Sequence, residues 1–212
     1  VIIVALQEQY KNLGNYLIQA INAIQNMNLD VELILIDESN SQPETVMKAI
    51  SHMEYVLKKP IVGGFLVKDC DTYFHYNLIT EPEEHPELPD ANFVTYANLE
   101  DNENITAMNK SYIETDELNS ITNMVEKKVI SSMFSVGGYG FENVESFKRA
   151  YHVVLNSEKE FHISHMVYGG ILNFNQKWIS IPSSSFFDWG TQRDWERYCQ
   201  DMTTGETNES DR

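Results

Sequence analysis

Apolar runs rich in β-branched residues alternate with segments of helical periodicity in the first third of the chain. The apolar runs at residues 1–6, 31–36 and 61–67 predict strands, and the stretches 10–27 and 44–57 between them predict helices. This order, with a repeat of about 30 residues, is typical of parallel crossovers in an α/β sheet. We therefore predict an α/β fold with a mixed, mainly parallel central sheet of Rossmann-like type, flanked by helices.

The rest of the chain changes character. After 81–90, an acidic segment that we interpret as a surface loop, the patterns predict strands at 92–98 and 136–141 and a hairpin formed by 110–115 and 120–126. Helices are predicted at 144–155, 161–172 and 192–202. The polar residues 203–212 predict a disordered tail or linker, and we interpret residues 1–202 as one domain.

The charge balance limits the partners of the chain. It has 15 Lys and Arg residues against 32 Asp and Glu residues, and its net charge is −17. A field of this sign repels nucleic-acid backbones and anionic lipid surfaces, and no apolar run approaches the roughly 20 residues of a membrane span. Cys70 and Cys199 are too few for a disulfide framework, which favours a reducing, cytoplasmic location.

Two aspartates follow the third predicted strand. In open α/β sheets ligands bind beyond the carboxyl ends of strands, so Asp69 and Asp71 are placed at the edge where substrates bind. Residues two apart in an extended chain point to the same side, and two carboxylates can hold one magnesium ion. The alternative is an ordinary turn at the end of a strand, held by the aspartate side chains.

A second acidic motif lies near the end of the chain. Asp188 stands among aromatic residues, directly before Trp189, Gly190 and Thr191. Thr191 is a suitable N-cap for the last predicted helix, whose free amide groups can hold an anion. The alternative is a capped turn without a ligand.

Two further stretches could bind a ligand: a charged pair at the end of a strand and a glycine-rich run. Glu126 and Lys127 end a predicted strand, where the lysine could hold a phosphate and the glutamate could orient hydroxyl groups. A solvated run of surface charge is the alternative. The glycines around Gly138 and Tyr139 predict either a close approach of the backbone to a ligand or a bent core strand.

Taken together and in order, these stretches resemble the sugar-phosphate nucleotidyltransferases and the related cytidylyltransferases of small phosphorylated head groups. The matching motifs are SQPETV at 41–46, DCDTYF at 69–74, VEK at 125–127, VGGYGF at 136–141, FHISH at 161–165 and FDWGT at 187–191. The resemblance covers nearly the whole chain, and it rests on the order of the motifs because each alone is short.

The resemblance implies magnesium-dependent transfer of a nucleoside monophosphate from a nucleoside triphosphate to a small phosphorylated acceptor, as in nucleotide-sugar and polysaccharide biosynthesis. In this scheme Asp71 and Asp188 hold Mg²⁺, and Asp69 adds a ligand through water. Lys127 and Glu126 bind the acceptor, together with Gly138, Tyr139 and Trp189. Gln42 reads an edge of the base. A homo-oligomer is compatible with this scheme.

The chain also departs from the family. Its first predicted strand matches the family's second strand, so we expect the family's first strand and glycine-rich phosphate loop upstream of Val1. A catalytically inactive relative that lost this loop is the alternative. A metal-dependent glycosyltransferase, which also uses Asp-x-Asp at the end of a strand, is a second alternative, but it has no need of the Glu126 and Asp188 motifs.

Overall fold

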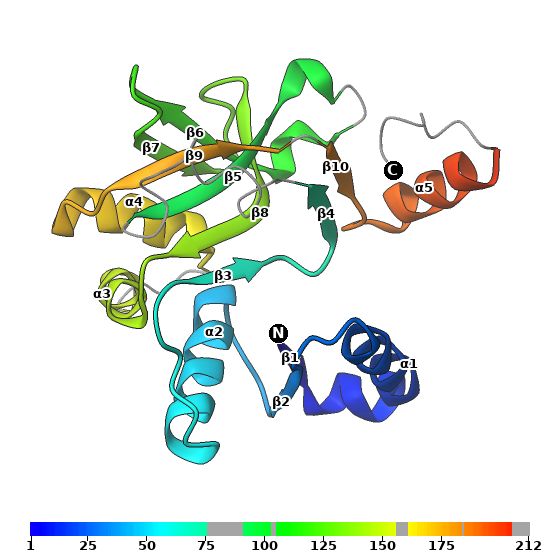
Figure 1. Cartoon of the computed structure of the whole chain (residues 1–212). Coiled ribbons are helices and arrows are strands. Elements are labelled where there is room, and N and C mark those ends of the chain that lie inside the picture. Colours follow the sequence, from blue (N-terminus) through cyan, green and yellow to red (C-terminus); the bar gives the residue numbers. More distant parts are fainter. Residues whose placement is uncertain (76–90, 103–104, 156–160, 184, 205–212) are drawn as a thin grey trace. The chain divides into compact units, whose positions relative to one another are not determined.

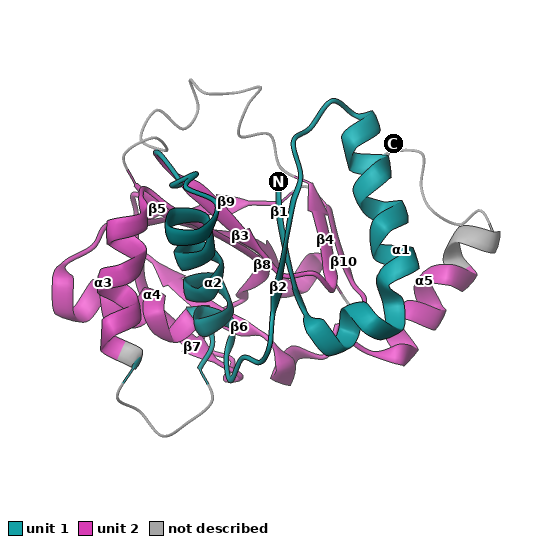
Figure 2. Cartoon of the chain, turned by 90° about the horizontal axis from the view of Figure 1, so that it is seen from below, with its two compact units in different colours: residues 1–62, 155–163 teal, residues 63–154, 164–212 magenta. Residues whose placement is uncertain are grey.

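The computed structural model describes residues 1–75, 91–102, 105–155, 161–183 and 185–204. It divides into two compact units. Unit 1 comprises Val1–Val62 and Leu155–Ile163, and unit 2 comprises Gly63–Val154 and Ser164–Arg212 (Figure 2). The predicted loop 81–90 lies outside the described residues. The polar tail was predicted over 203–212, but the last helix, α5 (Gln192–Thr204), includes its first two residues, and the rest of it lies outside the described residues.

Unit 1 is built from two strand and helix pairs. β1 pairs with β2 in parallel, with Val4 opposite Ile34. The second helix continues into a turn of π-helix. The single helix predicted over 44–57 is therefore an α-helix followed directly by a π-helix. The elements are β1 (Ile2–Leu6), α1 (Gln7–Asn26), β2 (Glu32–Ile36), α2 (Gln42–Ser51) and the π-helix His52–Val56.

The core of unit 1 lies between β2 and α2. Ile34, Ile36, Ala49 and Met53 bury their side chains against one another. The hydroxyl oxygen of Ser41 accepts a hydrogen bond from the backbone amide of Glu44 at 3.3 Å and so caps α2. This cap fixes the start of the helix.

Unit 2 contains a six-stranded sheet with the order β7-β6-β8-β5-β9, and β3 pairs with β8 beside this path. β8 is the central strand, and its residues from Phe134 to Phe141 are all buried. The strands are β3 (Phe65–Lys68), β5 (Asn92–Asn98), β6 (Ser111–Thr115), β7 (Ile121–Glu126), β8 (Met133–Phe141) and β9 (Trp178–Pro182). The helices of this part are α3 (Val144–Val154) and α4 (Ile163–Phe174).

A separate two-stranded ladder completes unit 2. β4 (Thr72–His75) pairs antiparallel with β10 (Ser185–Asp188), and α5 (Gln192–Thr204) follows β10 (Figure 1). Neither strand was predicted from the sequence, since each has only four residues. The ladder matters for the site because it sets Thr72 opposite Asp188.

The predicted class is confirmed: the chain is an α/β protein with a mixed central sheet, helices and an added hairpin. The parallel pairs are β1–β2 and β5–β9, while β3–β8, β5–β8, β6–β7 and β6–β8 are antiparallel. The antiparallel share of unit 2 comes from the hairpin β6–β7 and from the central position of β8. None of the helices in the described ranges is long and apolar enough to cross a membrane.

Candidate functional site

Asp71 and Asp188 are brought together by the β4–β10 ladder. Asp71 directly precedes β4, and Asp188 is the last residue of β10. The backbone amide of Trp189 donates to the carbonyl oxygen of Asp71 at 2.8 Å and extends this pairing by one hydrogen bond. Two residues 117 positions apart in the sequence therefore lie at the same end of one ladder.

The two carboxylates flank Gly190. A Cβ atom placed on Gly190 would lie 3.0 Å from Asp71 Oδ2 and 3.1 Å from Asp188 Oδ1. The two oxygens are therefore at most about 6 Å apart, which one hydrated divalent cation can span. Gly190 also donates its amide hydrogen to Asp188 Oδ1 at 2.9 Å, so it both leaves room for the pair and orients one member.

Lys110 is a member of this site that the sequence analysis did not identify. Its ammonium group donates to Asp188 Oδ2 and lies 5.1 Å from the centre of the Phe186 ring. The side chains are largely enclosed, with 11% of Lys110 and 19% of Asp188 exposed. One positive charge is thus held directly against the carboxylate pair.

Asp69 lies two residues before Asp71 and contacts β8. Its backbone amide donates to the carbonyl oxygen of Gly137 at 2.8 Å. A Cβ on Gly137 would be 2.7 Å from Asp69 Oδ2, and Gly137 has a φ of 89°, which favours glycine. The close approach at this glycine is therefore made by the Asp69 side chain.

Lys68 and Cys70 flank Asp69 in the sequence. Lys68 Nζ donates to the carbonyl oxygen of Asp69 at 2.8 Å and to that of Thr72. Burial lowers the pKa of Lys68. Burial, together with the carboxylates of Asp71 and Asp69, raises the pKa of the Cys70 thiol, which disfavours its use as a nucleophile.

Glu126 is held by hydroxyl groups. Ser111 Oγ and Ser164 Oγ both donate to Glu126 Oε2, the latter at 2.6 Å. Ser111 is 8% exposed and Ser164 is 1% exposed, so both donors are fixed in the interior. Two neutral hydroxyl groups therefore help to orient the carboxylate of Glu126.

Lys127 follows Glu126 and connects it to Lys110. The backbone amide of Lys127 donates to the carbonyl oxygen of Lys110 at 2.9 Å. Lys127 has an exposed side chain and a φ of 55°, a conformation that is costly for a residue with a Cβ. The predicted Glu126-Lys127 motif thus lies next to the lysine that binds Asp188.

Gly138 and Tyr139 lie in the buried part of β8. A Cβ on Gly138 would come within 2.4 Å of Thr95 Oγ1 and 2.6 Å of Phe74, so neighbouring side chains occupy this space. The Tyr139 hydroxyl bonds to Ser135 and Ser111, and burial and the nearby Asp69 carboxylate raise its pKa. Of the two alternatives for the glycine-rich stretch, the packing supports the bent core strand.

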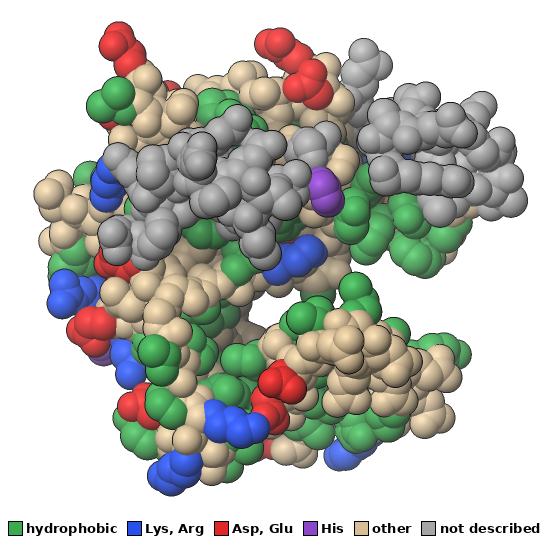
Figure 3. Space-filling view, in the orientation of Figure 1, with side chains coloured by type: hydrophobic (Ala, Val, Ile, Leu, Met, Phe, Trp, Pro, Cys, Tyr) green, Lys and Arg blue, Asp and Glu red, His purple; other side chains and the backbone are tan. Residues whose placement is uncertain are grey.

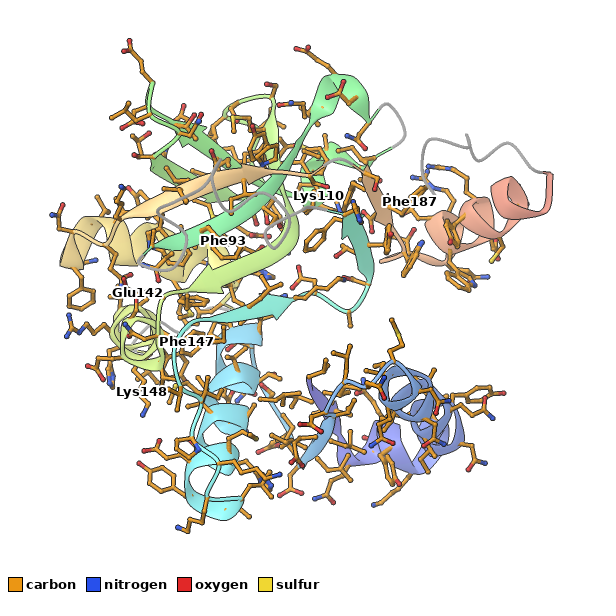
Figure 4. All side chains as sticks on the ribbon, in the orientation of Figure 1. Phe93, Lys110, Glu142, Phe147, Lys148 and Phe187 are labelled. Atoms are coloured by element: carbon orange, nitrogen blue, oxygen red, sulfur yellow. The ribbon has the colours of Figure 1, made fainter. Side chains whose placement is uncertain are left out.

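Trp189 belongs to an aromatic cluster on the ladder and α5. Its ring contacts those of Tyr73, Trp195 and Tyr198, with centroids 6.3, 5.9 and 5.2 Å away. Phe187 joins the cluster (Figure 4), and hydrophobic side chains gather on this part of unit 2 (Figure 3). The Trp189 indole nitrogen is buried without a hydrogen-bond partner in the described structure.

Gln42, the predicted base-reading residue, belongs to unit 1. It is the first residue of α2, and its side-chain oxygen accepts from the amide of Ile163 at 3.5 Å, which is a long hydrogen bond. Its role stays a prediction, because it is the one predicted site residue outside unit 2.

The carboxylate oxygens of Asp71 and Asp188 suit magnesium better than a metal that requires many protein ligands. Among the residues that the structure describes, no three His, Cys, Asp or Glu side chains gather in a metal-binding group. Mg²⁺ keeps several water molecules and is usually held by one or two carboxylates together with substrate phosphates. Two oxygens around Gly190, with Asp69 nearby in sequence, fit that pattern.

One sequence signal could have identified Lys110. The hairpin predicted over 110–115 and 120–126 sets its first and last residues opposite each other, and the structure pairs Ser111 with Glu126. A lysine at the open end of that hairpin is therefore adjacent to Lys127. The missing information was the β4–β10 ladder, which brings Asp188 to the same place.

Comparison with known structures defines the class of fold. The chain has 15% sequence identity to a nucleoside-diphosphate-sugar pyrophosphorylase from Vibrio cholerae RC9, with a TM-score of 0.73 over 94% of this chain and 80% of that one. No protein-family model matches the sequence, and no curated protein is similar enough to match. The fold is thus the one found in sugar pyrophosphorylases.

Two further structures have the same fold. A putative glucose-1-phosphate thymidylyltransferase from Bacillus anthracis is 12% identical, with a TM-score of 0.69 over 92% of this chain and 73% of that one. An inositol-1-phosphate CTP transferase from T. maritima is also 12% identical, with a TM-score of 0.63 over 91% and 71%. The structural neighbours are therefore nucleotidyltransferases for several different acceptors.

Proposed function

We propose that the protein is a nucleotidyltransferase that moves a nucleoside monophosphate from a nucleoside triphosphate to a sugar phosphate or a similar small phosphorylated acceptor and releases pyrophosphate. The observation that carries this proposal is the convergence of Asp71 Oδ2 and Asp188 Oδ1 on Gly190. The fold shared with sugar pyrophosphorylases supports it.

Asp71 and Asp188 would hold Mg²⁺, with Asp69 acting through a bound water molecule. When bound, Mg²⁺ supplies the positive charge that neutralises phosphate oxygens during displacement. The protein contributes position: the β4–β10 ladder fixes the two backbones, and the Gly190 amide orients Asp188. Little chemistry beyond alignment and charge neutralisation is required for this class of reaction.

Lys127 and Glu126 would bind the acceptor. Lys127 is exposed, so a phosphate can reach its side chain from solvent, and the hydroxyls of Ser111 and Ser164 orient Glu126. Gly138 and Tyr139 are buried in β8 and would support the acceptor side from the core, without contacting the acceptor. Trp189 would offer an aromatic face beside Asp188.

The nucleotide base would be read by Gln42, whose side-chain amide has both donor and acceptor atoms. The first turn of α2 carries this residue, and the Ser41 cap fixes the position of that turn. We infer a cytoplasmic protein that produces an activated, diphosphate-linked precursor.

The test is pyrophosphate release. The protein is incubated with each of four nucleoside triphosphates, Mg²⁺ and a panel of phosphorylated sugars and amino alcohols. We expect acceptor-dependent pyrophosphate with one combination. Sugar transfer from an activated donor without pyrophosphate would instead support the glycosyltransferase. Tight nucleotide binding without pyrophosphate for any acceptor would support the inactive relative.

A further inference from the structure

The ammonium group of Lys110 is in contact with only one oxygen of Asp188 in the bonds described above. It donates to Oδ2, whereas Oδ1 accepts the Gly190 amide and lies 3.1 Å from the position of a Cβ on Gly190. Figure 4 shows the Lys110 side chain beside β10. The lysine therefore neutralises Asp188 at Oδ2, the oxygen that does not bond to Gly190.

The surroundings fix this arrangement. Lys110 lies between the Asp188 carboxylate and the face of the Phe186 ring, and only 11% of its side chain is exposed. Poor access to water strengthens both the ion pair and the cation–π contact. With Lys110 in place, the trio of Asp71, Asp188 and Lys110 carries one net negative charge instead of two.

We propose that Lys110 is a positioning residue that weakens the affinity of the carboxylate pair for a free divalent cation and makes tight cation binding depend on an accompanying phosphate. The inference rests on the proposed function, because it assumes that Asp71 and Asp188 hold the cation. The single remaining negative charge attracts a divalent ion weakly, while the nearby ammonium group attracts the anionic phosphate.

Binding the cation and the phosphate together has a chemical advantage for transfer between phosphates. A pair with two uncompensated charges would repel the triphosphate whenever the cation is absent. With Lys110 present, cation and phosphate bind best together, so each brings the charge that the other requires.

The experiment measures the binding of Mn²⁺ to the protein without nucleotide. The electron paramagnetic resonance signal of the free aqua ion reports unbound Mn²⁺, and the bound fraction follows by difference. In the full-length protein we expect Lys110→Met to bind Mn²⁺ about tenfold more tightly than the wild type, since one positive charge beside a divalent site is removed. Inorganic pyrophosphate also binds Mn²⁺ in solution, so a protein-free sample with the same pyrophosphate gives the amount to subtract. After this subtraction, pyrophosphate should strengthen Mn²⁺ binding in the wild type and do so much less in Lys110→Met.

Three controls make the result specific. Lys177→Met removes the same charge from an exposed lysine and should leave Mn²⁺ binding at the wild-type value. Lys110→Arg keeps the charge and should also behave as the wild type. Melting temperatures with and without Mn²⁺ guard against misfolding, and Mn²⁺ should raise the melting temperature of Lys110→Met more than that of the wild type.

The outcomes separate the two proposals. Unchanged or weaker Mn²⁺ binding by folded Lys110→Met overturns the role of Lys110, and the proposed function survives if Asp71→Asn and Asp188→Asn still abolish Mn²⁺ binding. Mn²⁺ binding that is insensitive to both aspartate substitutions, or absent from wild type and Lys110→Met alike, overturns both proposals. Tighter binding that Asp188→Asn reverses supports both.

Discussion

Unit 2 holds carboxylates in two opposite environments. Asp71 and Asp188 converge at Gly190, and the ammonium group of Lys110 bonds to Asp188. Glu126, by contrast, accepts two hydrogen bonds from the buried hydroxyls of Ser111 and Ser164. Two carboxylates that lie close together with only one positive charge bonded to them attract a cation. A carboxylate that is oriented by hydroxyl donors is suited to hydrogen bonding with a polar ligand. Two different tasks follow from the same side-chain chemistry.

The largest expected effect comes from removing the negative charge of Asp71 or of Asp188. We expect Asp71→Asn and Asp188→Asn each to lower kcat by about 1,000-fold or more, because a ligand of the essential cation is lost while the fold is kept. Pyrophosphate release measures the effect, and circular dichroism checks the fold. Near-normal turnover in both variants would refute the metal assignment.

Crowding Asp71 and Asp188 should have the next largest effect. Gly190→Ala places a Cβ 3.0 Å from Asp71 Oδ2 and 3.1 Å from Asp188 Oδ1, so at least one carboxylate must shift. We expect kcat to fall by tens of fold, less than the about 100-fold that a 1 Å misplacement can cost, because the carboxylates must give way by only a few tenths of an ångström. Turnover unchanged by this substitution would mean that the space between the carboxylates is not used.

The acceptor side is tested by Lys127→Ala. We expect KM for the phosphorylated acceptor to rise about tenfold, as for loss of one hydrogen bond to a charged group, with little change in the nucleotide dissociation constant. Steady-state kinetics and nucleotide titration give the two numbers. Equal losses for both ligands would contradict an acceptor-specific role.

The smallest expected effect concerns the hydroxyl support of Glu126. Ser164→Ala removes one of the two donors, and we expect kcat/KM for the acceptor to fall about fivefold, with unchanged nucleotide binding. Ser164→Thr keeps a hydroxyl and serves as the matched control. A loss of stability without any change in acceptor kinetics would show that the serine acts only in folding.

Much of the fold could be predicted from the sequence because periodicity reports burial. The strand over 92–98 and the helix beginning at 192 are found where predicted. The third strand was expected over 61–67, but β3 begins at Phe65 because Gly63 adopts a φ of 77° and interrupts the run. β4 and β10 are too short to produce a pattern, and their pairing depends on tertiary packing.

The site was predictable in part, because some of its residues lie in recognisable short motifs. The aspartate motifs were visible as short sequences, but nothing local in them specifies that Asp71 and Asp188 meet at Gly190. The predicted hairpin could place Lys110 beside Lys127, but its bond to Asp188 depends on the ladder that carries Asp188. Only the resemblance of the ordered motifs to a known family linked these positions in advance.

The adjacent residues Lys110 and Ser111 serve different partners. One bonds to Asp188, and the next bonds to Glu126. An insertion or deletion that slides β6 by a single position would misplace both side chains at once. Libraries intended to broaden acceptor choice should therefore hold the length of this hairpin constant and randomise side chains around it.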